Sequence, residues 1–366
     1  MTGPRGAHTQ AWLELLRVSA LLTVPGDALA GAAALAVRPN RGTALAVASS
    51  LCLYEAGMAL NDWADRAEDA IDRPHRPIPS GRISPTAALS AAGALSAAGL
   101  LLASRAGRPT LAVASAVTAT VWAYDLKLKH TALAPAAMAT ARALDLLMGA
   151  TATGSFRPAG GGAPRSGRGG ASPADRAATA SRLPSAHAAH ALSAAALLAA
   201  HTYGVTEVSR HEVQGGSTAV PAGALGTVAA IAIGLSRGAE RGTAPNEGGS
   251  VRSAVRTAAV SSGPARPGGD RRGVGGQLGA WPDPLARRAV ARVLAATYLR
   301  TAGLPLLHAA LNPSPPLTQR AVGGGIRAMI PLQAALAARS GALGTGAALL
   351  ALAPVARRLA RKVSPT

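Results

Sequence analysis

The stretch TALAVASSLCLYEAGMAL, Thr43–Leu60, runs directly into NDWADRAED, Asn61–Asp69, and this junction decides the fold. A helix needs ~20 apolar residues to cross the ~30 Å hydrocarbon core of a bilayer, and the first stretch approaches that length. The second stretch is dense in acids, which lipid does not tolerate without partners. The sequence therefore predicts a membrane helix that ends at a polar site.

The composition of the whole chain agrees with a membrane protein. Of its 366 residues, 49% are hydrophobic and 15% are charged, whereas charged residues make up about 25% of soluble domains. Aromatic residues contribute 2%, with a single Phe. A soluble core would lack large side chains, but helices in lipid pack through small residues. The composition therefore favours a bundle of membrane helices.

Apolar runs recur along the chain. Nine approach the length of a membrane helix: Val18–Val37, Thr43–Leu60, Pro85–Ser104, Thr110–Tyr124, Thr131–Thr153, Ala186–Thr206, Ala219–Leu235, Ala289–Leu311 and Ser340–Ala356. A shorter run, Ala328–Ala338, fits a half-helix or a tenth span. Ala28 and Ala30 also fit the cleavage site of a signal peptide in the first run. We expect an all-α, multi-pass bundle of about nine transmembrane helices, forming one domain over residues 1–366.

Two segments interrupt this pattern. Phe156–Leu183 and Arg237–Arg288 are rich in Gly, Ser, Pro and Arg, and are expected to be low-complexity loop insertions. Their arginines contribute much of the net charge of +20. Nucleic-acid binding would call for interleaved aromatic residues or a known binding motif, which these segments lack. We therefore expect no nucleic-acid partner.

The acids after Leu60 have helical spacing. Asn61, Asp65 and Asp69 are four residues apart, and Asp62 lies three before Asp65, so a continued helix would place them on one face. Clustered carboxylates need cations, and hard oxygen ligands suit Mg²⁺, the usual companion of a substrate phosphate. These four residues are the predicted metal ligands. The alternative is a polar loop neutralised by neighbouring arginines.

NDWADRAED followed by DRPHRPIPSGRIS, Asp72–Ser84, resembles the first aspartate-rich signature of the UbiA-type intramembrane prenyltransferases. The resemblance implies a helical bundle with a central cavity, where Mg²⁺ holds an isoprenyl diphosphate for transfer to a small acceptor. It places Asn61, Asp62, Asp65 and Asp69 on the metal and diphosphate positions, with Arg76 near the phosphate.

The family's second acidic signature is altered in this chain. HTYGVTEVSRHEVQGGS, His201–Ser217, carries Glu207 and Glu212 in place of the expected aspartates, with Arg210 between them. Glutamate oxygens are equally hard, so both are candidate Mg²⁺ ligands and Arg210 a candidate substrate contact. A solvated turn is the alternative. The departure indicates a divergent branch, similar to the EboC-like members.

A third polar motif, YDLKLKH, Tyr124–His130, resembles the Tyr-x-x-x-Leu-Lys loop of the same family. It is expected on the same side of the membrane as the first signature. Lys127 and Lys129 would neutralise a leaving diphosphate beside Tyr124, or simply follow the preference for positive cytoplasmic loops.

Arg142 and Asp145 lie three residues apart within an apolar run, so they are expected to pair on one helical face. Ionisable residues inside a span are functional candidates, although a structural ion pair is the alternative.

These features together predict a Mg²⁺-dependent prenyltransferase, integral to a membrane and expected in a bacterial cell membrane. Its catalytic group would comprise Asp62, Asp65, Asp69, Lys127 and Arg142. Two other functions are compatible with the sequence. A transporter or flippase of a lipid precursor would keep the diphosphate site without chemistry, and a membrane scaffold would use none of these residues.

Overall fold

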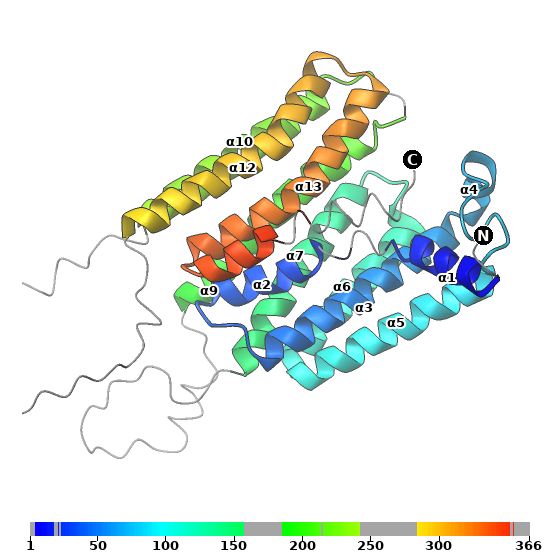
Figure 1. Ribbon diagram of the computed structural model, residues 1–366, viewed down its shortest axis with the longest axis horizontal. Coiled ribbons are helices and arrows are strands. Elements are labelled where there is room, and N and C mark those ends of the chain that lie inside the picture. Colours follow the sequence, from blue (N-terminus) through cyan, green and yellow to red (C-terminus); the bar gives the residue numbers. More distant parts are fainter. Residues whose placement is uncertain are drawn as a thin grey trace, which may run out of the picture.

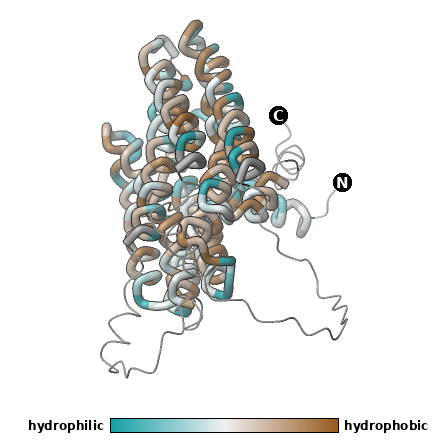
Figure 2. The backbone as a smooth tube through the Cα atoms, turned by 90° about the vertical axis from the view of Figure 1, so that its left-hand side faces the viewer, coloured by the Kyte–Doolittle hydropathy of each residue, from teal (hydrophilic) through white to brown (hydrophobic). Residues whose placement is uncertain are grey.

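The computed structural model describes residues 4–17, 21, 23–156, 185–213, 215–241, 284–351 and 354. All regular elements within these residues are helices, and the long ones run roughly side by side (Figure 1). Apolar residues predominate along them (Figure 2). The predicted all-α bundle is confirmed. Most residues of the predicted insertions at 156–183 and 237–288 lie outside the described residues, but residues 237–241 and 284–288 are helical, so the bounds of the second insertion were wrong.

The first half of the chain supplies most of the helices around the site. They are α1 (Pro4–Leu15), α2 (Pro25–Ala34), α3 (Arg41–Ala64), α4 (Arg66–Asp72), α5 (Pro85–Ala106), α6 (Arg108–Ala123), the π-helical turn η2 (Tyr124–Leu128) and α7 (Ala134–Ser155). Proline occupies the first turn of α2, α5, α6 and α7, where its missing N–H costs no hydrogen bond.

The second half contributes α9 (Ser185–Ser209), α10 (Ala219–Arg241), α12 (Pro284–Leu311) and α13 (Pro315–Arg339). Residues 343–351 are also helical. α12 packs against both α10 and α13, while α13 returns to contact α2, so the second half closes against the first. α7 contacts α2, α3, α6 and α9, which makes it the central helix of the bundle.

Two of the predicted runs were wrong in their boundaries. Within Val18–Val37 the regular helix begins only at Pro25 and has 10 residues, short of the ~20 that span a bilayer. The short run Ala328–Ala338 is the second part of the 25-residue helix α13. Gly323–Gly325 and Arg327 lower the hydropathy of the first part of α13, so the apolar run marks only its second part.

Four helices of the described residues are long and apolar enough to cross a membrane: α3, α5, α10 over Ala219–Arg237, and α13. The predicted number of about nine spans is not confirmed. Several of the remaining helices are shorter or carry more polar side chains, so hydropathy alone does not mark them.

Hydrogen bonds fix the start of α3 against the end of α7. Asn40 caps α3, and its Nδ2 donates to the carbonyl oxygen of Thr153 at 3.1 Å. The hydroxyls of Thr43 and Thr153 lie 2.8 Å apart. These contacts hold the two helices in register at the end of the bundle opposite the acidic signature.

Glycines let α2 and α7 approach until their backbones touch. A Cβ added at Gly31 would lie 2.1 Å from the carbonyl oxygen of Leu146, and one at Gly149 would lie 2.3 Å from Cα of Ala28. Small residues at a crossing are the usual means of close helix packing in lipid. The contact places the polar residues of α2 directly against those of α7.

Gly31→Ala should therefore destabilise the protein by about 1–3 kcal/mol, the usual cost of overpacking a tight core. Gly93→Ala in α5 is the matched control, because a Cβ there meets no atom within 4 Å. Thermal unfolding in detergent, followed by circular dichroism, compares the two variants. Equal unfolding temperatures would contradict the close α2–α7 contact.

Candidate functional site

The helix that carries the acidic signature breaks at Asp65. α3 ends at Ala64 and α4 begins at Arg66, with Asp65 serving as the cap between them. The expectation that Asn61, Asp62, Asp65 and Asp69 lie on one continuous helix was therefore wrong. The break turns α4 away from the axis of α3 (Figure 1). Asp62 and Asp69 share Arg76 as a partner, whereas Asn61 and Asp65 contact Asp125 and Lys129.

Arg76 joins two of the carboxylates. Its Nη1 lies 2.7 Å from Oδ2 of Asp69 and 3.5 Å from Oδ1 of Asp62. Asp62 also accepts from Arg17 at 3.0 Å, and Asp69 pairs with Arg73 at 3.4 Å. Asp62 and Asp69 are both buried. Buried carboxylates are stable only with such partners, so the arginines after Asp72 are part of the site.

The other two residues of the signature face the turn between α6 and α7. Nδ2 of Asn61 donates to Oδ1 of Asp125 at 3.0 Å, and Lys129 forms an ion pair with Asp65. The prediction that YDLKLKH lies on the same side as the first signature is confirmed. A π-helical turn such as η2 is uncommon and often occurs at functional sites.

Asp125 is a residue that the sequence analysis missed. It lies in η2, directly after the end of α6, and is buried. Burial raises the pKa of Asp125 from 3.8 to about 6, against the lowering effects of the Asn61 hydrogen bond and of Lys129. In the sequence, the only indication of a role for Asp125 was its position within the YDLKLKH motif. Lys127, in the same turn, is exposed, and Tyr124 lines the cavity described next.

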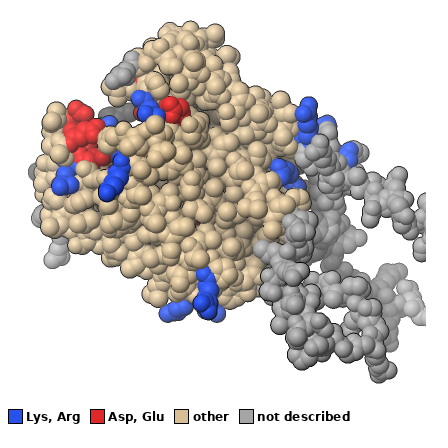
Figure 3. Space-filling model, turned by 180° about the vertical axis from the view of Figure 1, so that it is seen from behind, with Lys and Arg blue, Asp and Glu red and all other residues tan. Residues whose placement is uncertain are grey.

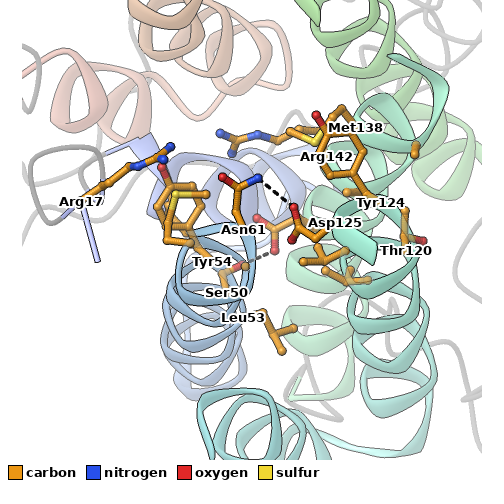
Figure 4. Close-up of a pocket in the computed structure, with 18 residues that line it drawn as sticks. Arg17, Ser50, Leu53, Tyr54, Asn61, Thr120, Tyr124, Asp125, Met138 and Arg142 are labelled. Atoms are coloured by element: carbon orange, nitrogen blue, oxygen red, sulfur yellow. Dashed lines mark hydrogen bonds between the residues drawn. The ribbon is translucent and has the colours of Figure 1, made fainter. Parts of the chain in front are cut away.

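A cavity of about 260 Å³ opens beside this polar cluster, between α3, α6 and α7. Figure 4 shows its polar side chains, including Asn61, Asp125 and Tyr124 at one end. Leu53, Val117, Val121 and Met138 contribute apolar wall. A charged end joined to an apolar wall suits a ligand that is itself polar at one end and apolar at the other.

Arg142 and Asp145 both line the cavity, but they have separate partners. Nη1 of Arg142 lies 2.5 Å from Oδ2 of Asp27 on α2, and the carboxylate of Asp145 accepts from the hydroxyl of Ser50 on α3. The predicted pairing of Arg142 with Asp145 was therefore wrong, because α2 brings a better acceptor from 115 residues away.

Asp27 connects the two halves of the chain. It is fully buried, and its Oδ1 accepts from Nε2 of Gln333 on α13 at 2.7 Å. An acid within an apolar run is a functional candidate on that ground alone, and this was the signal that could have identified Asp27. Gln333 had no comparable signal.

The second signature lies at the end of α9. Arg210 pairs with Glu207 at 3.3 Å, and both side chains are partly exposed. Burial raises the pKa of Glu212, while nearby Arg73 lowers it. Glu212 is thus within electrostatic reach of the first signature. Its role as a metal ligand stays a prediction.

The donors at this end of the bundle suit a hard cation. Asn61, Asp62, Asp65 and Asp69 offer oxygen ligands, the type that Mg²⁺ prefers. Among the described residues, Asp65, Glu68 and His130 form a group whose ligand atoms lie within 4.8 Å of one another. Figure 3 shows acids gathered beside Lys and Arg on this surface. The donor set fits a magnesium diphosphate in charge and chemistry.

The sequence pattern of the family described as UbiA prenyltransferase family matches residues 20–203. Digeranylgeranylglyceryl phosphate synthase of Methanopyrus kandleri is 35% identical over 129 residues, 34% of this chain and 46% of that protein. The protein of the same name from Ignicoccus hospitalis is 37% identical over 145 residues, 39% of this chain and 48% of that protein. The chain thus spans about half the length of the curated relatives it matches.

A solved structure described as digeranylgeranylglyceryl phosphate synthase in membranes has the same fold. Its TM-score is 0.51 at 15% sequence identity, and the similarity covers 92% of this chain and 99% of that one. The resemblance to the EboC-like members stays a prediction.

Asp27→Ala should cost about 3–5 kcal/mol of stability, because it leaves the Arg142 guanidinium in the bundle without its carboxylate. Arg210→Ala removes an arginine from an ion pair near the surface and should change stability by less than about 1 kcal/mol. Thermal unfolding of both variants in detergent is the measurement. If the two variants unfold at the same temperature, the Asp27–Arg142 pair is not a structural link.

Proposed function

The chain belongs to the UbiA prenyltransferase family, and we propose that it transfers an isoprenyl group from an isoprenyl diphosphate to a small acceptor within the membrane, with Mg²⁺ as cofactor. One observation carries this proposal. The acids and bases around Asp62, Asp65 and Arg76 lie at one end of an apolar-walled cavity between α3, α6 and α7.

The ion pairs of the site define how a diphosphate would be held. Asp62, Asp65 and Asp69 each have a cationic partner in the structure. These carboxylates would hold Mg²⁺, and Arg17, Arg76 and Lys129 would then be free to donate to phosphate oxygens, which are strong charge-assisted acceptors. The exchange keeps charges paired, so the substrate enters without leaving a buried ion alone.

The same cations would stabilise the leaving group. When the bond between the prenyl carbon and the diphosphate oxygen breaks, its electron pair stays on the diphosphate, and Arg17, Arg76 and Lys129 would donate to it, with the exposed Lys127 of η2 as a further donor. The apolar wall excludes water, which would otherwise capture the electrophilic carbon. The proton that the acceptor loses as the new bond forms would pass to a carboxylate that lines the cavity, Asp145 near the acceptor or Asp125 at the polar end.

The deeper part of the cavity would receive the acceptor. Tyr54, Arg142 and Asp145 line it and provide donors and acceptors for a polar group, while Ser50 holds Asp145 in place. The names of the relatives suggest that a lipid bearing a glyceryl phosphate is the first acceptor to test. They also favour a synthase over a transporter. A bacterial cell membrane is the proposed location.

Glu207 and Glu212 would hold a second Mg²⁺, with Arg210 donating to the diphosphate. The support is electrostatic, because Glu212 and Arg73 influence each other. Arg73 also pairs with Asp69, so its charge acts on an acid of each signature.

Asp65→Asn should reduce turnover at least about 100-fold, because it removes a charged ligand and the partner of Lys129. Asp72 is an exposed acid of the same segment, so Asp72→Asn should leave turnover within about twofold of the wild type. The assay measures pyrophosphate release and labelled lipid product in nanodiscs, with lipid extract and a glyceryl phosphate lipid as acceptors. Equal activity of both variants would contradict the assignment.

Chelation of divalent ions should abolish binding of a labelled isoprenyl diphosphate, and added Mg²⁺ should restore it. Without Mg²⁺, Asp62, Asp65 and Asp69 would stay paired with Arg17, Lys129 and Arg76. These basic side chains could then not donate to the diphosphate. Binding to the wild type is measured by filtration of nanodiscs, with Asp72→Asn as the control protein. Undiminished binding in chelator would show that the acids are not metal ligands.

A further inference from the structure

The charges around the cavity limit what the acceptor can be. Among the described residues that line the cavity, two are basic, Arg17 and Arg142, and two are acidic, Asp125 and Asp145. Arg17 is neutralised by Asp62, at 3.0 Å. Under the proposed function, Arg17 would donate to the diphosphate once the carboxylates hold Mg²⁺. Of the described lining residues, this leaves Arg142 as the basic side chain that could meet a charge on the acceptor.

Arg142 is itself neutralised by Asp27. Its Nη1 lies 2.5 Å from Oδ2 of Asp27, which is fully buried. The other oxygen of Asp27, Oδ1, accepts from Nε2 of Gln333 at 2.7 Å. Gln333 is fully buried as well, and its amide satisfies the carboxylate without adding a charge. The Arg142–Asp27 pair therefore carries no net charge.

Further contacts hold the amide of Gln333 in place beside α2. Its Nε2 also donates to the carbonyl oxygen of Thr23 at 3.0 Å. A Cβ added at Gly26 would lie 2.0 Å from Oε1 of Gln333, so the glycine makes the room that the amide occupies. Because Asp27 is held from this side by an uncharged group, its carboxylate is left to balance the charge of Arg142 alone.

The acid at the same end of the cavity adds no positive charge either. Asp145 follows Arg142 by three residues on α7 and accepts from the hydroxyl of Ser50. An ionised Asp145 makes this end negative, and a protonated Asp145 makes it neutral. In both states an anionic acceptor would be buried there without a cation, which is unfavourable. The polar end of the cavity offers no alternative, because the diphosphate of the donor would occupy it.

The same side chains suit a hydroxyl group. Ser50, Tyr54 and Arg142 lie around the cavity (Figure 4). Arg142 has more N–H groups than the one bonded to Asp27. A hydroxyl can accept from Arg142 and donate to Asp145, whereas a phosphate or carboxylate can only accept. A neutral hydroxyl group therefore matches both residues without leaving a charge unpaired.

Resting on the proposed function, we propose that the acceptor is an uncharged molecule bearing a hydroxyl group, and that the neutral Arg142–Asp27 pair disfavours anionic acceptors. The hydroxyl oxygen would bond to the prenyl carbon as the bond between that carbon and the diphosphate oxygen breaks. The electron pair of the broken bond leaves on the diphosphate, and the hydroxyl proton passes to a carboxylate that lines the cavity. The products are a prenyl ether and pyrophosphate.

The first test compares uncharged with anionic acceptors on the wild type in nanodiscs. A cell extract that includes the lipids is separated by anion exchange at neutral pH into an uncharged and an anionic fraction. Each fraction is incubated with labelled geranylgeranyl diphosphate and Mg²⁺. The uncharged fraction should give at least about tenfold more labelled product, because an anionic acceptor would be buried without a cation. Mass spectrometry and NMR should identify this product as a prenyl ether.

More product from the anionic fraction, or equal product from both, would overturn the proposal while leaving prenyl transfer in place. A new bond to carbon in place of oxygen would also overturn it. If neither fraction gives labelled product, the proposed transfer itself fails, and the inference fails with it.

The second test changes the charge balance at Arg142. Asp27→Asn removes one negative charge and keeps a carboxamide oxygen as an acceptor, so Arg142 gains surplus positive charge. The ratio of product from the anionic fraction to product from the uncharged fraction should rise at least about tenfold. Asp72→Asn removes the same charge at an exposed position and should leave this ratio within about twofold of the wild type.

An unchanged ratio in Asp27→Asn would overturn the role of the Arg142–Asp27 pair. Retained turnover with the uncharged fraction shows that this variant is folded. The first test needs no variant, so it decides the class of acceptor even if Asp27→Asn does not fold.

Discussion

Charge balance among buried carboxylates governs this structure. Asp62 and Asp69 lie at the end of a membrane bundle, where an unpaired charge would cost several kcal/mol, and both contact Arg76. Because one guanidinium serves two acids, the segment after α4 must fold back over the end of α3. The helix break at Asp65 makes this possible, and it also turns Asp65 toward Lys129. The polar end of the cavity is a consequence of these pairings.

Buried charges must also be paired within the bundle, and there α7 contacts most of the helices involved. Its Gly149 brings it against α2, which allows Arg142 to reach Asp27. Asp27 in turn accepts from Gln333 of α13, so a contact needed to satisfy one charge also joins the second half of the chain to the first. A change at Asp27 would therefore alter the contacts of both α7 and α13, whose Gln333 lies 306 residues further along the chain.

Hydropathy and motifs predicted what depends on local sequence. Most of the apolar runs coincide with helices because a span is recognisable from its own composition. The break at Asp65 was not predictable from spacing, since residues three and four apart share a face only where the helix continues. The partners of Arg142 and Asn61 were also missed. Each is supplied by a segment distant in sequence, and Asp125 is hidden among lysines that dominate its motif.

The two kinds of wall in the cavity follow from what each helix can offer. At one end, the end of α3 and the turn η2 add the acids and amides that suit a polar head. Along the rest, α6 and α7 add small and apolar side chains, and the hydroxyl of Thr120 is satisfied by its own helix, so hydrocarbon gains most from contact there. A ligand that is charged at one end and apolar along its length matches both kinds of wall, which a soluble metabolite would not do.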